Sequence, residues 1–142
     1  MVFMKRGLLQ LFIVPAIILG IGSCSDKGGG GGGGGGGEAN LAVTLTPPAG
    51  STQPAAPQVD FPLTVSITST MPSQGVTIDV KAAPDGSATN FFTESRSSTT
   101  ANNNFTITST PTGVVCVTTV TVTSKTKATN TVTLSYRYTR KP

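Results

Sequence analysis

The sequence predicts an all-β fold, a single antiparallel β-sandwich of about seven strands over residues 41–142. Apolar residues alternate with Pro, Thr and Ser along several stretches of this region, for example at Phe61, Leu63, Val65 and Ile67. A period of two is typical of strands that have one face on the core and the other in water. The stretches are rich in Thr, Val and Ile, which suit a pleated sheet. No comparable stretch has the 3.6-residue period of a helix.

Turn signals separate the alternating runs and set the expected order of the strands. We expect strands at about 41–46, 61–70, 76–82, 91–95, 104–109, 114–124 and 130–139. A Pro-rich crossover over residues 47–57 follows the first strand, and residues 72–75, 84–86, 102–104 and 111–113 mark further turns. Because the polar residues 125–130 join the last two long runs, these two strands are expected to pair as a hairpin.

Seven short antiparallel strands in about 100 residues are similar to the immunoglobulin-like and fibronectin-type-III-like domains of bacterial surface lipoproteins. This resemblance covers residues 41–142 and is carried by the strand pattern. The pair of Cys flanking a Trp that marks antibody domains is absent, because the chain contains no Trp. The resemblance therefore implies an Ig-like architecture and assigns no subfamily.

The first residues have the composition of a secretory signal peptide. Lys5 and Arg6 precede a mostly apolar run over residues 7–21. This run is shorter than the about 20 apolar residues that a membrane-spanning helix needs, and it ends in small residues. A basic start, an apolar centre and a small-residue exit are the three parts of a signal peptide.

The exit from this segment, Ile21, Gly22, Ser23 and Cys24, resembles the bacterial lipobox, in which an aliphatic residue and two small residues precede an obligatory Cys. The resemblance implies that residues 1–23 are removed and that Cys24 is lipidated. Two or three acyl chains would anchor the protein to a membrane without spanning it. An ordinary cleaved signal peptide with an incidental Cys is the alternative.

The residues after Cys24 bear on location. Ser25 resembles the residue that sends enterobacterial lipoproteins to the outer membrane, and Asp26 with Lys27 is similar to the export signals of Bacteroidetes surface lipoproteins. The expected location is the bacterial cell envelope, at the outer membrane. The sequence does not decide between the inner and the outer membrane, nor between the periplasmic and the exposed side of the outer membrane.

Residues 24–40 are expected to form a flexible tether between the lipidated Cys24 and the sandwich. Residues 28–37 are ten consecutive Gly, which have no side chains to bury and the largest backbone entropy to lose. A glycine loop that cradles phosphate is not supported, because no Gly-Lys-Ser/Thr follows and no helix is expected to begin there.

Composition excludes several kinds of catalytic or metal site. The chain has no His and two Cys, so it has no imidazole acid or base, no His-ligated metal and too few thiols for a zinc cluster. No spacing among its acids brings together the carboxylate pair of a glycosidase or the six to eight oxygens of a calcium site. The acids are Asp26, Glu38, Asp60, Asp79, Asp85 and Glu94. We therefore expect a protein that is not an enzyme and needs no cofactor or metal.

Parity along the strands predicts the direction of several side chains. Cys116 is expected to point inward as a small buried hydrophobe, with a reactive or intermolecularly paired thiol as the alternative. Tyr136 and Tyr138 have the parity of the core. Phe91 and Phe92 are adjacent, so one ring is expected inside and the other outside.

Basic residues dominate the last third of the chain, where no acid follows Glu94. The sandwich interpretation places Lys125 and Lys127 at one end and Arg137, Arg140 and Lys141 toward the other. Such residues protect sheet edges against pairing, and the alternative is a weak attraction to anionic lipids or acidic glycans. Nucleic acid is disfavoured as a partner by the expected compartment.

These observations predict a membrane-anchored lipoprotein with a non-catalytic, Ig-like binding or adhesion module. Its partner would be a protein or a glycan that the sequence does not identify. The alternative is a structural or accessory subunit of an envelope assembly that pairs by strand addition. The ligand-binding residues are left unassigned.

Overall fold

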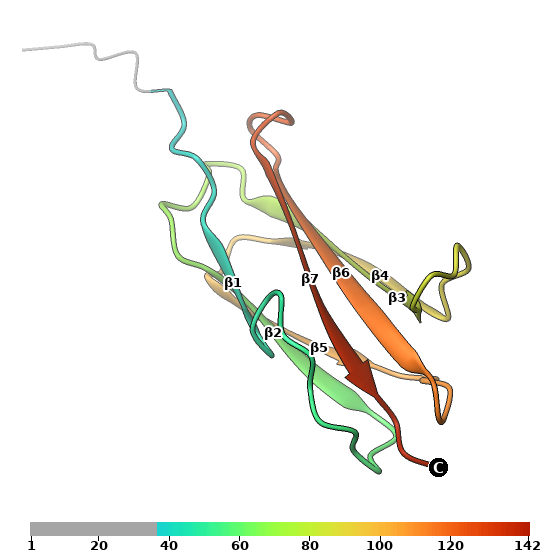
Figure 1. Ribbon diagram of the computed structural model, residues 1–142. Helices are drawn as coiled ribbons and strands as arrows, with labels where there is room; N and C mark the ends of the chain where they lie inside the picture. Colours follow the sequence, from blue (N-terminus) through green and yellow to red (C-terminus); the bar gives the residue numbers. More distant parts are fainter. Residues whose placement is uncertain (1–36) are drawn as a thin grey trace, which may run out of the picture. The chain divides into compact units, whose positions relative to one another are not determined.

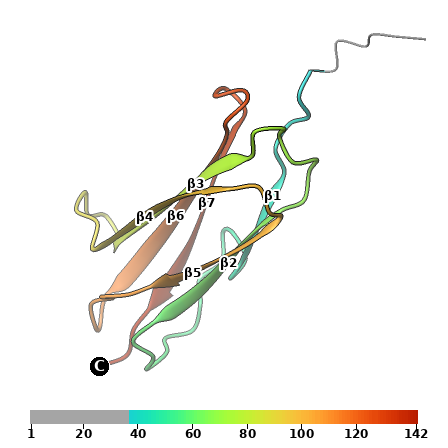
Figure 2. The same ribbon diagram turned by 180° about the vertical axis from the view of Figure 1, so that it is seen from behind.

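Residues 37–142 are described by the computed structural model, and they form seven strands in two antiparallel sheets. Figures 1 and 2 show the two sheets as the layers of a sandwich, so the predicted all-β fold class is confirmed. The predicted signal peptide, the predicted lipobox and the glycine run up to residue 36 lie outside the described residues. The described part contains no helix that could cross a membrane.

The two sheets contain three and four strands. The first has the order β1-β2-β5, and the second has the order β4-β3-β6-β7. The strands are β1 (Val43–Thr46), β2 (Phe61–Ile67), β3 (Val76–Pro84), β4 (Phe92–Ser98), β5 (Asn102–Ile107), β6 (Val115–Ser124) and β7 (Thr131–Thr139). The predicted hairpin of the last two strands is confirmed by the antiparallel register of β6 and β7.

One predicted turn is wrong, because Asn102, Asn103 and Asn104 belong to β5. The side chains of Asn102 and Asn104 face polar residues of β2 and accept hydrogen bonds from them. Ser66 Oγ donates to Asn102 Oδ1 at 2.8 Å, and Thr64 Oγ1 donates to Asn104 Oδ1 at 2.9 Å. Cross-strand pairing therefore outweighs the local turn preference of asparagine.

The core lies between the sheets and is built from the alternate residues of both. Val65, Ile78, Val80 and Val120 are each fully buried. This one-sided burial explains the period of two in the sequence, because successive side chains of a strand point to opposite faces.

Side-chain directions mostly agree with the parity analysis. Cys116, Tyr136 and Tyr138 are buried, as predicted. Phe91 and Phe92 differ from the prediction, because both are half-buried and both pack against the core. Phe91 lies just before β4 begins, so the alternation of a strand does not apply to it.

The strand order places β4 beside β3, whereas the fourth strand of a constant-type immunoglobulin domain joins the sheet of the first strand. Residues 85–91 connect β3 directly to β4. A short connection lets these strands pair as a hairpin, with Ala82 opposite Phe92 and Val76 opposite Ser98.

Residues 47–58, which we call the crossover segment, leave the first sheet and run beside β7 of the second. The Gly50 N–H donates to the Ser135 carbonyl at 2.7 Å, and the Gln53 N–H donates to the Arg137 carbonyl at 2.8 Å. Thr52 also forms a parallel bridge with Arg137. The segment before β2 is therefore divided between the two sheets.

The connections define two ends of the sandwich. Residue 37 and the loops 68–75, 99–101 and 125–130 lie at what we call the proximal end. The loops 85–91 and 108–114 and the C terminus lie at the distal end (Figure 1). The predicted separation of Lys125 and Lys127 from Arg137, Arg140 and Lys141 is confirmed by these positions.

Hydrogen bonds fasten the residues before β1 to the β6–β7 hairpin. The Glu38 carboxylate accepts hydrogen bonds from Ser124 Oγ at 2.9 Å and from Asn130 Nδ2 at 2.6 Å. The bond from Ser124 in particular holds the pKa of Glu38 below its usual range. The Leu41 N–H donates to Asn130 Oδ1 at 2.9 Å. These bonds determine that the chain joins the sandwich at the proximal end.

We expect Leu63→Ala to lower the free energy of unfolding by about 2–5 kcal/mol, because it removes buried apolar contacts and leaves a cavity. Leu63 is 1% exposed, whereas Val59 is 54% exposed. The matched change Val59→Ala is therefore expected to stay within about 0.5 kcal/mol of the parent. Urea unfolding followed by circular dichroism measures both, and equal effects would contradict this account of the core.

Candidate functional site

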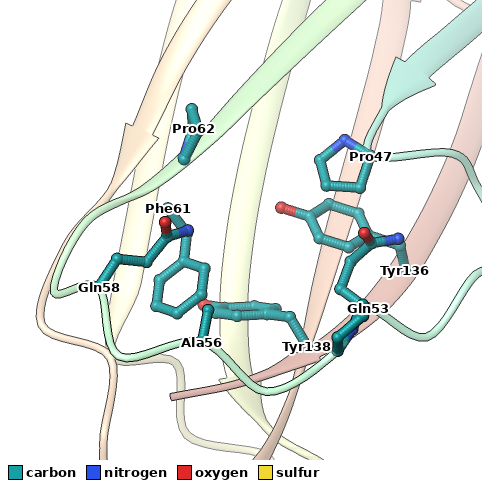
Figure 3. Close-up of a pocket in the computed structure, with 9 residues that line it drawn as sticks. Pro47, Gln53, Ala56, Gln58, Phe61, Pro62, Tyr136 and Tyr138 are labelled. Carbon is teal, nitrogen blue, oxygen red and sulfur yellow. The ribbon is translucent and has the colours of Figure 1, made fainter. Parts of the chain in front are cut away.

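An apolar pocket lies between the crossover segment and strands β2 and β7, toward the distal end (Figure 3). Its volume is about 170 Å³. None of its nine lining residues carries a charge. They are Pro47, Gln53, Pro54, Ala56, Gln58, Phe61, Pro62, Tyr136 and Tyr138.

The pocket exists because β1 is shorter than the strand it pairs with. The pairing of β1 with β2 ends where Thr46 lies opposite Thr64, so Phe61 and Pro62 have no neighbour on that side. The chain leaves β2 at Pro47 and follows β7 as far as Ala56, whose N–H donates to the Thr139 carbonyl at 3.0 Å. The crossover segment therefore covers the gap beside β2 without filling it.

Three aromatic rings form the floor of the pocket. The ring centroids of Phe61 and Tyr138 are 4.5 Å apart, and those of Tyr136 and Tyr138 are 5.8 Å apart. Both pairs are tilted, and their separations are in the range of favourable aromatic contacts. All three rings are buried, so this floor is held rigidly by the core.

The two tyrosine hydroxyls differ in their hydrogen bonding. The hydroxyl of Tyr138 shares a hydrogen bond with the buried hydroxyl of Thr110 at 3.2 Å. The hydroxyl of Tyr136 is buried and has no hydrogen-bond partner, and the same holds for Thr118 on the neighbouring strand. Figure 3 shows the Tyr136 hydroxyl pointing into the space between Pro47 and Phe61.

Burial raises the pKa of Tyr136 to about 12. The Thr118 hydroxyl opposes this rise in part, although its geometry does not reach that of a hydrogen bond. Burial also raises the pKa of Tyr138. Both phenols are therefore protonated at neutral pH.

Two other hollows on the described part are larger, with volumes of about 340 and 300 Å³, and are open to solvent. One lies beside Asp85 at the β3–β4 turn, and the other lies beside Glu38 at the proximal end. Asp85 is engaged with Arg137, whose Nε donates to Asp85 Oδ2 at 3.1 Å. Within residues 37–142 no three acidic or Cys side chains are grouped so that they could hold a metal.

The free sheet edges are a second kind of candidate site. The Thr68 N–H donates to the Ala42 carbonyl, whereas the Ile67 N–H donates to the Ala101 carbonyl on the other side. The backbone N–H and C=O groups of the even-numbered residues of β2 therefore point toward β1. Pro62 therefore lies where β2 has no neighbour, and it has no N–H to offer an added strand.

Arg96 of β4 contacts β5 across the edge of the sandwich that lies away from the pocket. Its Cζ atom lies 4.4 Å from the centroid of the Phe105 ring, and its Nη1 donates to the Asn104 carbonyl at 3.0 Å. An ion pair with Glu94 holds the same guanidinium. A charge held against an edge in this way hinders pairing with another strand.

The lipobox residues Ile21, Gly22 and Ser23 and the predicted lipidation site Cys24 lie outside the described residues. Cys116 is fully buried and is not in a disulfide. Burial raises the pKa of its thiol and so lowers its thiolate fraction. This environment favours the interpretation of Cys116 as a buried hydrophobe over that of a reactive thiol.

The sequence left the ligand-binding residues unassigned, and the pocket residues were not among its candidates. The sequence predicts Tyr136 and Tyr138 in the core and places Pro47 and Pro54 in a Pro-rich crossover. A possible signal is that both tyrosines of the chain lie on one face of one strand, opposite a Pro-rich segment. Comparisons with protein-family models, with curated proteins and with solved structures found no match.

The same chemical change at the two tyrosines is expected to have opposite effects on stability. Tyr136→Phe removes a buried hydroxyl without a partner, so the free energy of unfolding should stay unchanged or rise by up to about 1 kcal/mol. Tyr138→Phe leaves the buried Thr110 hydroxyl unpaired and should cost about 1–2 kcal/mol. Urea unfolding of both variants is the measurement, and a larger loss for Tyr136→Phe would contradict the assigned hydrogen bonding.

Stability is also expected to fall in alkaline solution. The ordinary pKa of tyrosine is 10.0, and that of Tyr136 in the folded protein is about 12. The contribution of Tyr136 to the free energy of unfolding is therefore fully present below pH 10 and is lost as the pH rises toward 12. The reason is that the phenol of Tyr136 loses its proton at a lower pH in the unfolded chain than in the folded protein. The loss should reach about 2–3 kcal/mol. Urea unfolding between pH 9 and 12 should show a smaller fall for Tyr136→Phe than for the parent, and equal falls would refute the assignment.

Proposed function

We infer that this chain is a lipid-anchored lipoprotein of the bacterial cell envelope whose β-sandwich is a non-catalytic binding module. The anchor is supported by the signal-peptide pattern and by Ile21, Gly22, Ser23 and Cys24. The binding role is carried by one observation, the partly open, uncharged pocket beneath the crossover segment.

Binding fits the chemistry of the pocket better than catalysis does. General acid–base catalysis needs a group whose pKa lies near the operating pH. The pKa of Tyr136 is about 12, and the lining residues include no acid, base or thiol. Apolar walls with a small number of placed polar groups are typical of sites that hold a ligand.

A pocket fits the surface of the sandwich better than strand addition does. Pro62 has no N–H to donate to an added strand at the uncovered part of β2. Arg96 donates to the Asn104 carbonyl of β5, so this carbonyl is not free to accept from an added strand. The crossover segment pairs with the distal half of β7. The outer edge of β4, around Ser95, carries none of these features, and the same holds for the outer edge of β1 and the proximal half of β7.

The connection to the predicted tether supports access to the pocket. The described chain begins at the proximal end, beside the β6–β7 hairpin. The pocket lies beside Phe61 and Tyr138, in the half of the sandwich toward the distal end. A tether joined to the proximal end would therefore leave the mouth of the pocket clear of its point of attachment.

Site-specific photocrosslinking in intact cells tests the binding role. A photocrosslinking amino acid at Gln58 stands at the mouth of the pocket, and one at Ser95 stands on the β4 edge. We expect a crosslinked partner at Gln58. The variant Ala56→Leu, which places extra carbon atoms in the pocket, should abolish this crosslink, whereas Ala55→Leu on the neighbouring exposed residue should retain it.

Crosslinks at Ser95 alone would instead support an accessory subunit that pairs by strand addition. An absence of crosslinks at both positions would refute binding at the pocket and strand addition at the β4 edge. A crosslink at Gln58 that survives in Ala56→Leu would show contact with the surface and not with the pocket.

The anchor is tested by Cys24→Ser. The parent chain is expected to incorporate a labelled fatty acid and to sediment with membranes. Cys24→Ser should lose the label and move to the soluble fraction or remain as the uncut precursor. Cys116→Ser is the matched control and should keep the label, because Cys116 lies in the core. Equal labelling of the two variants would contradict the lipobox assignment.

A further inference from the structure

The outer edge of β4 presents backbone groups that no strand of the described chain pairs with, because β4 ends its sheet. The Lys125 N–H donates to the Gly75 carbonyl, so the odd-numbered residues of β3 direct their backbone groups toward β6. The even-numbered residues of β3 therefore exchange hydrogen bonds with the even-numbered residues of β4. The N–H and C=O groups of Thr93, Ser95 and Ser97 consequently point away from the sheet.

The sequence of this edge is complementary to itself. Ser95 is flanked by one acid, Glu94, and one base, Arg96. If a second β4 lies antiparallel to the first with Ser95 opposite Ser95, Glu94 of each copy faces Arg96 of the other. These are non-hydrogen-bonded positions, where facing side chains come closest. A register moved by two residues places Glu94 opposite Glu94, or Arg96 opposite Arg96, and is unfavourable.

The register that matches the charges also matches the backbone. In it Thr93 faces Ser97 of the second copy, and Ser95 faces its own equivalent. All of these residues direct their N–H and C=O groups outward, so each facing pair can exchange two hydrogen bonds. We propose that the chain forms a two-fold symmetric dimer in which two β4 edges pair antiparallel about Ser95. The two four-stranded sheets then become one continuous sheet.

The charges of this edge select an identical strand as the partner. Arg96 and Glu94 form an ion pair within the strand, and their side chains are 45% and 33% exposed, so both can contact a neighbouring strand. The contact of Arg96 with the Phe105 ring holds the guanidinium toward β5 and leaves the outer backbone of β4 uncovered. A strand with another order of charges brings like charges together here, whereas a second copy brings opposite charges together.

The other uncovered edges do not have this self-complementarity. β1 (Val43–Thr46) is four residues long and carries no charge, and the distal half of β7 pairs with the crossover segment. β4 contributes seven residues, fewer than the about 20–30 residues a side of a standard stable interface, so the dimer is expected to be weak. The lipid anchor proposed above would favour it by raising the local concentration of the chain.

The symmetry of the dimer is compatible with two anchors in one membrane. Antiparallel pairing places the proximal ends of the two copies at opposite ends of the dimer. Residues 24–36 could span about 45 Å if fully extended. This reach exceeds the length of about 33 Å of β6, which has ten residues. Both copies could therefore reach the same lipid surface.

Cysteine crosslinking of the full chain tests the pairing, in liposomes of phosphatidylethanolamine and phosphatidylglycerol. Ser95→Cys places two thiols at the two-fold axis, with Cα atoms about 5.5 Å apart, a distance that a disulfide spans. Ser97→Cys is the matched control on the same edge, because its two copies lie about 14 Å apart. With copper phenanthroline as the oxidant, Ser97→Cys should give about tenfold less disulfide-linked dimer than Ser95→Cys. The parent should give none, because Cys116 is buried.

Charge reversal tests the register. Glu94→Arg and Arg96→Glu are each introduced into the Ser95→Cys chain, with different epitope tags. Each variant alone faces like charges across the two-fold axis, so its crosslinked dimer should fall about tenfold. When the two variants share the same liposomes, opposite charges face each other at both positions, and the heterodimer should recover. Loss of the ion pair within each strand persists in the mixture, so recovery reports on the contact between copies and shows that both variants are folded.

The outcomes separate this dimer from the binding role of the pocket. Equal crosslinking of Ser95→Cys and Ser97→Cys overturns the proposal, and so does a mixture of the charge variants that gives no more dimer than either alone. In the photocrosslinking experiment above, a product at Ser95 that joins two copies of this chain supports the dimer. A product that joins a different protein overturns it in favour of strand addition by an accessory partner. A crosslink at Gln58 that Ala56→Leu removes would in either case still support binding at the pocket.

Discussion

A strand cannot pair with two sheets along the same residues, and the first strand region of this protein is divided between them. β1 pairs with β2 as far as Thr46, after which the crossover segment follows β7. Three features depend on this division. The distal half of β7 is covered, the Phe61 end of β2 is left without a neighbour, and the space between them becomes the pocket. The constraint is the hydrogen-bonding demand of the backbone, because each N–H and C=O of the segment can be satisfied by one sheet at a time.

The pocket combines a rigid floor with one unsatisfied polar atom. Tyr138 and Phe61 are held by the core, and the Tyr138 hydroxyl is paired with Thr110. Tyr136 occupies the next inward position on the same strand, yet its hydroxyl lacks a partner. A phenylalanine at position 136 would satisfy the core equally well. The presence of a hydroxyl at some cost to stability is the kind of local conflict that is expected at functional sites.

Charged residues lie mainly at the edges of the sandwich and not in the pocket. Arg96 bridges β4 and β5, Arg137 pairs with Asp85 at the distal end, and Pro62 lies on the uncovered part of β2. These positions limit pairing with other chains. The pocket itself is uncharged. The edge-protecting role that the sequence suggested for the basic residues is most direct at Arg96.

The sequence by itself determined the fold class, the approximate strands and the inward positions of Cys116, Tyr136 and Tyr138, because burial of one face of a strand imposes a period of two. The predicted lipobox and the predicted lipidation of Cys24 rest on the sequence alone and stay predictions. Only the tertiary structure decided that residues 102–104 extend β5 and that the crossover segment follows β7, because both depend on hydrogen bonds between residues far apart in the chain. The same reason applies to the pocket. Alternation predicts that a tyrosine points inward, but the partner of its hydroxyl, or the lack of one, is set by the strands that pack around it.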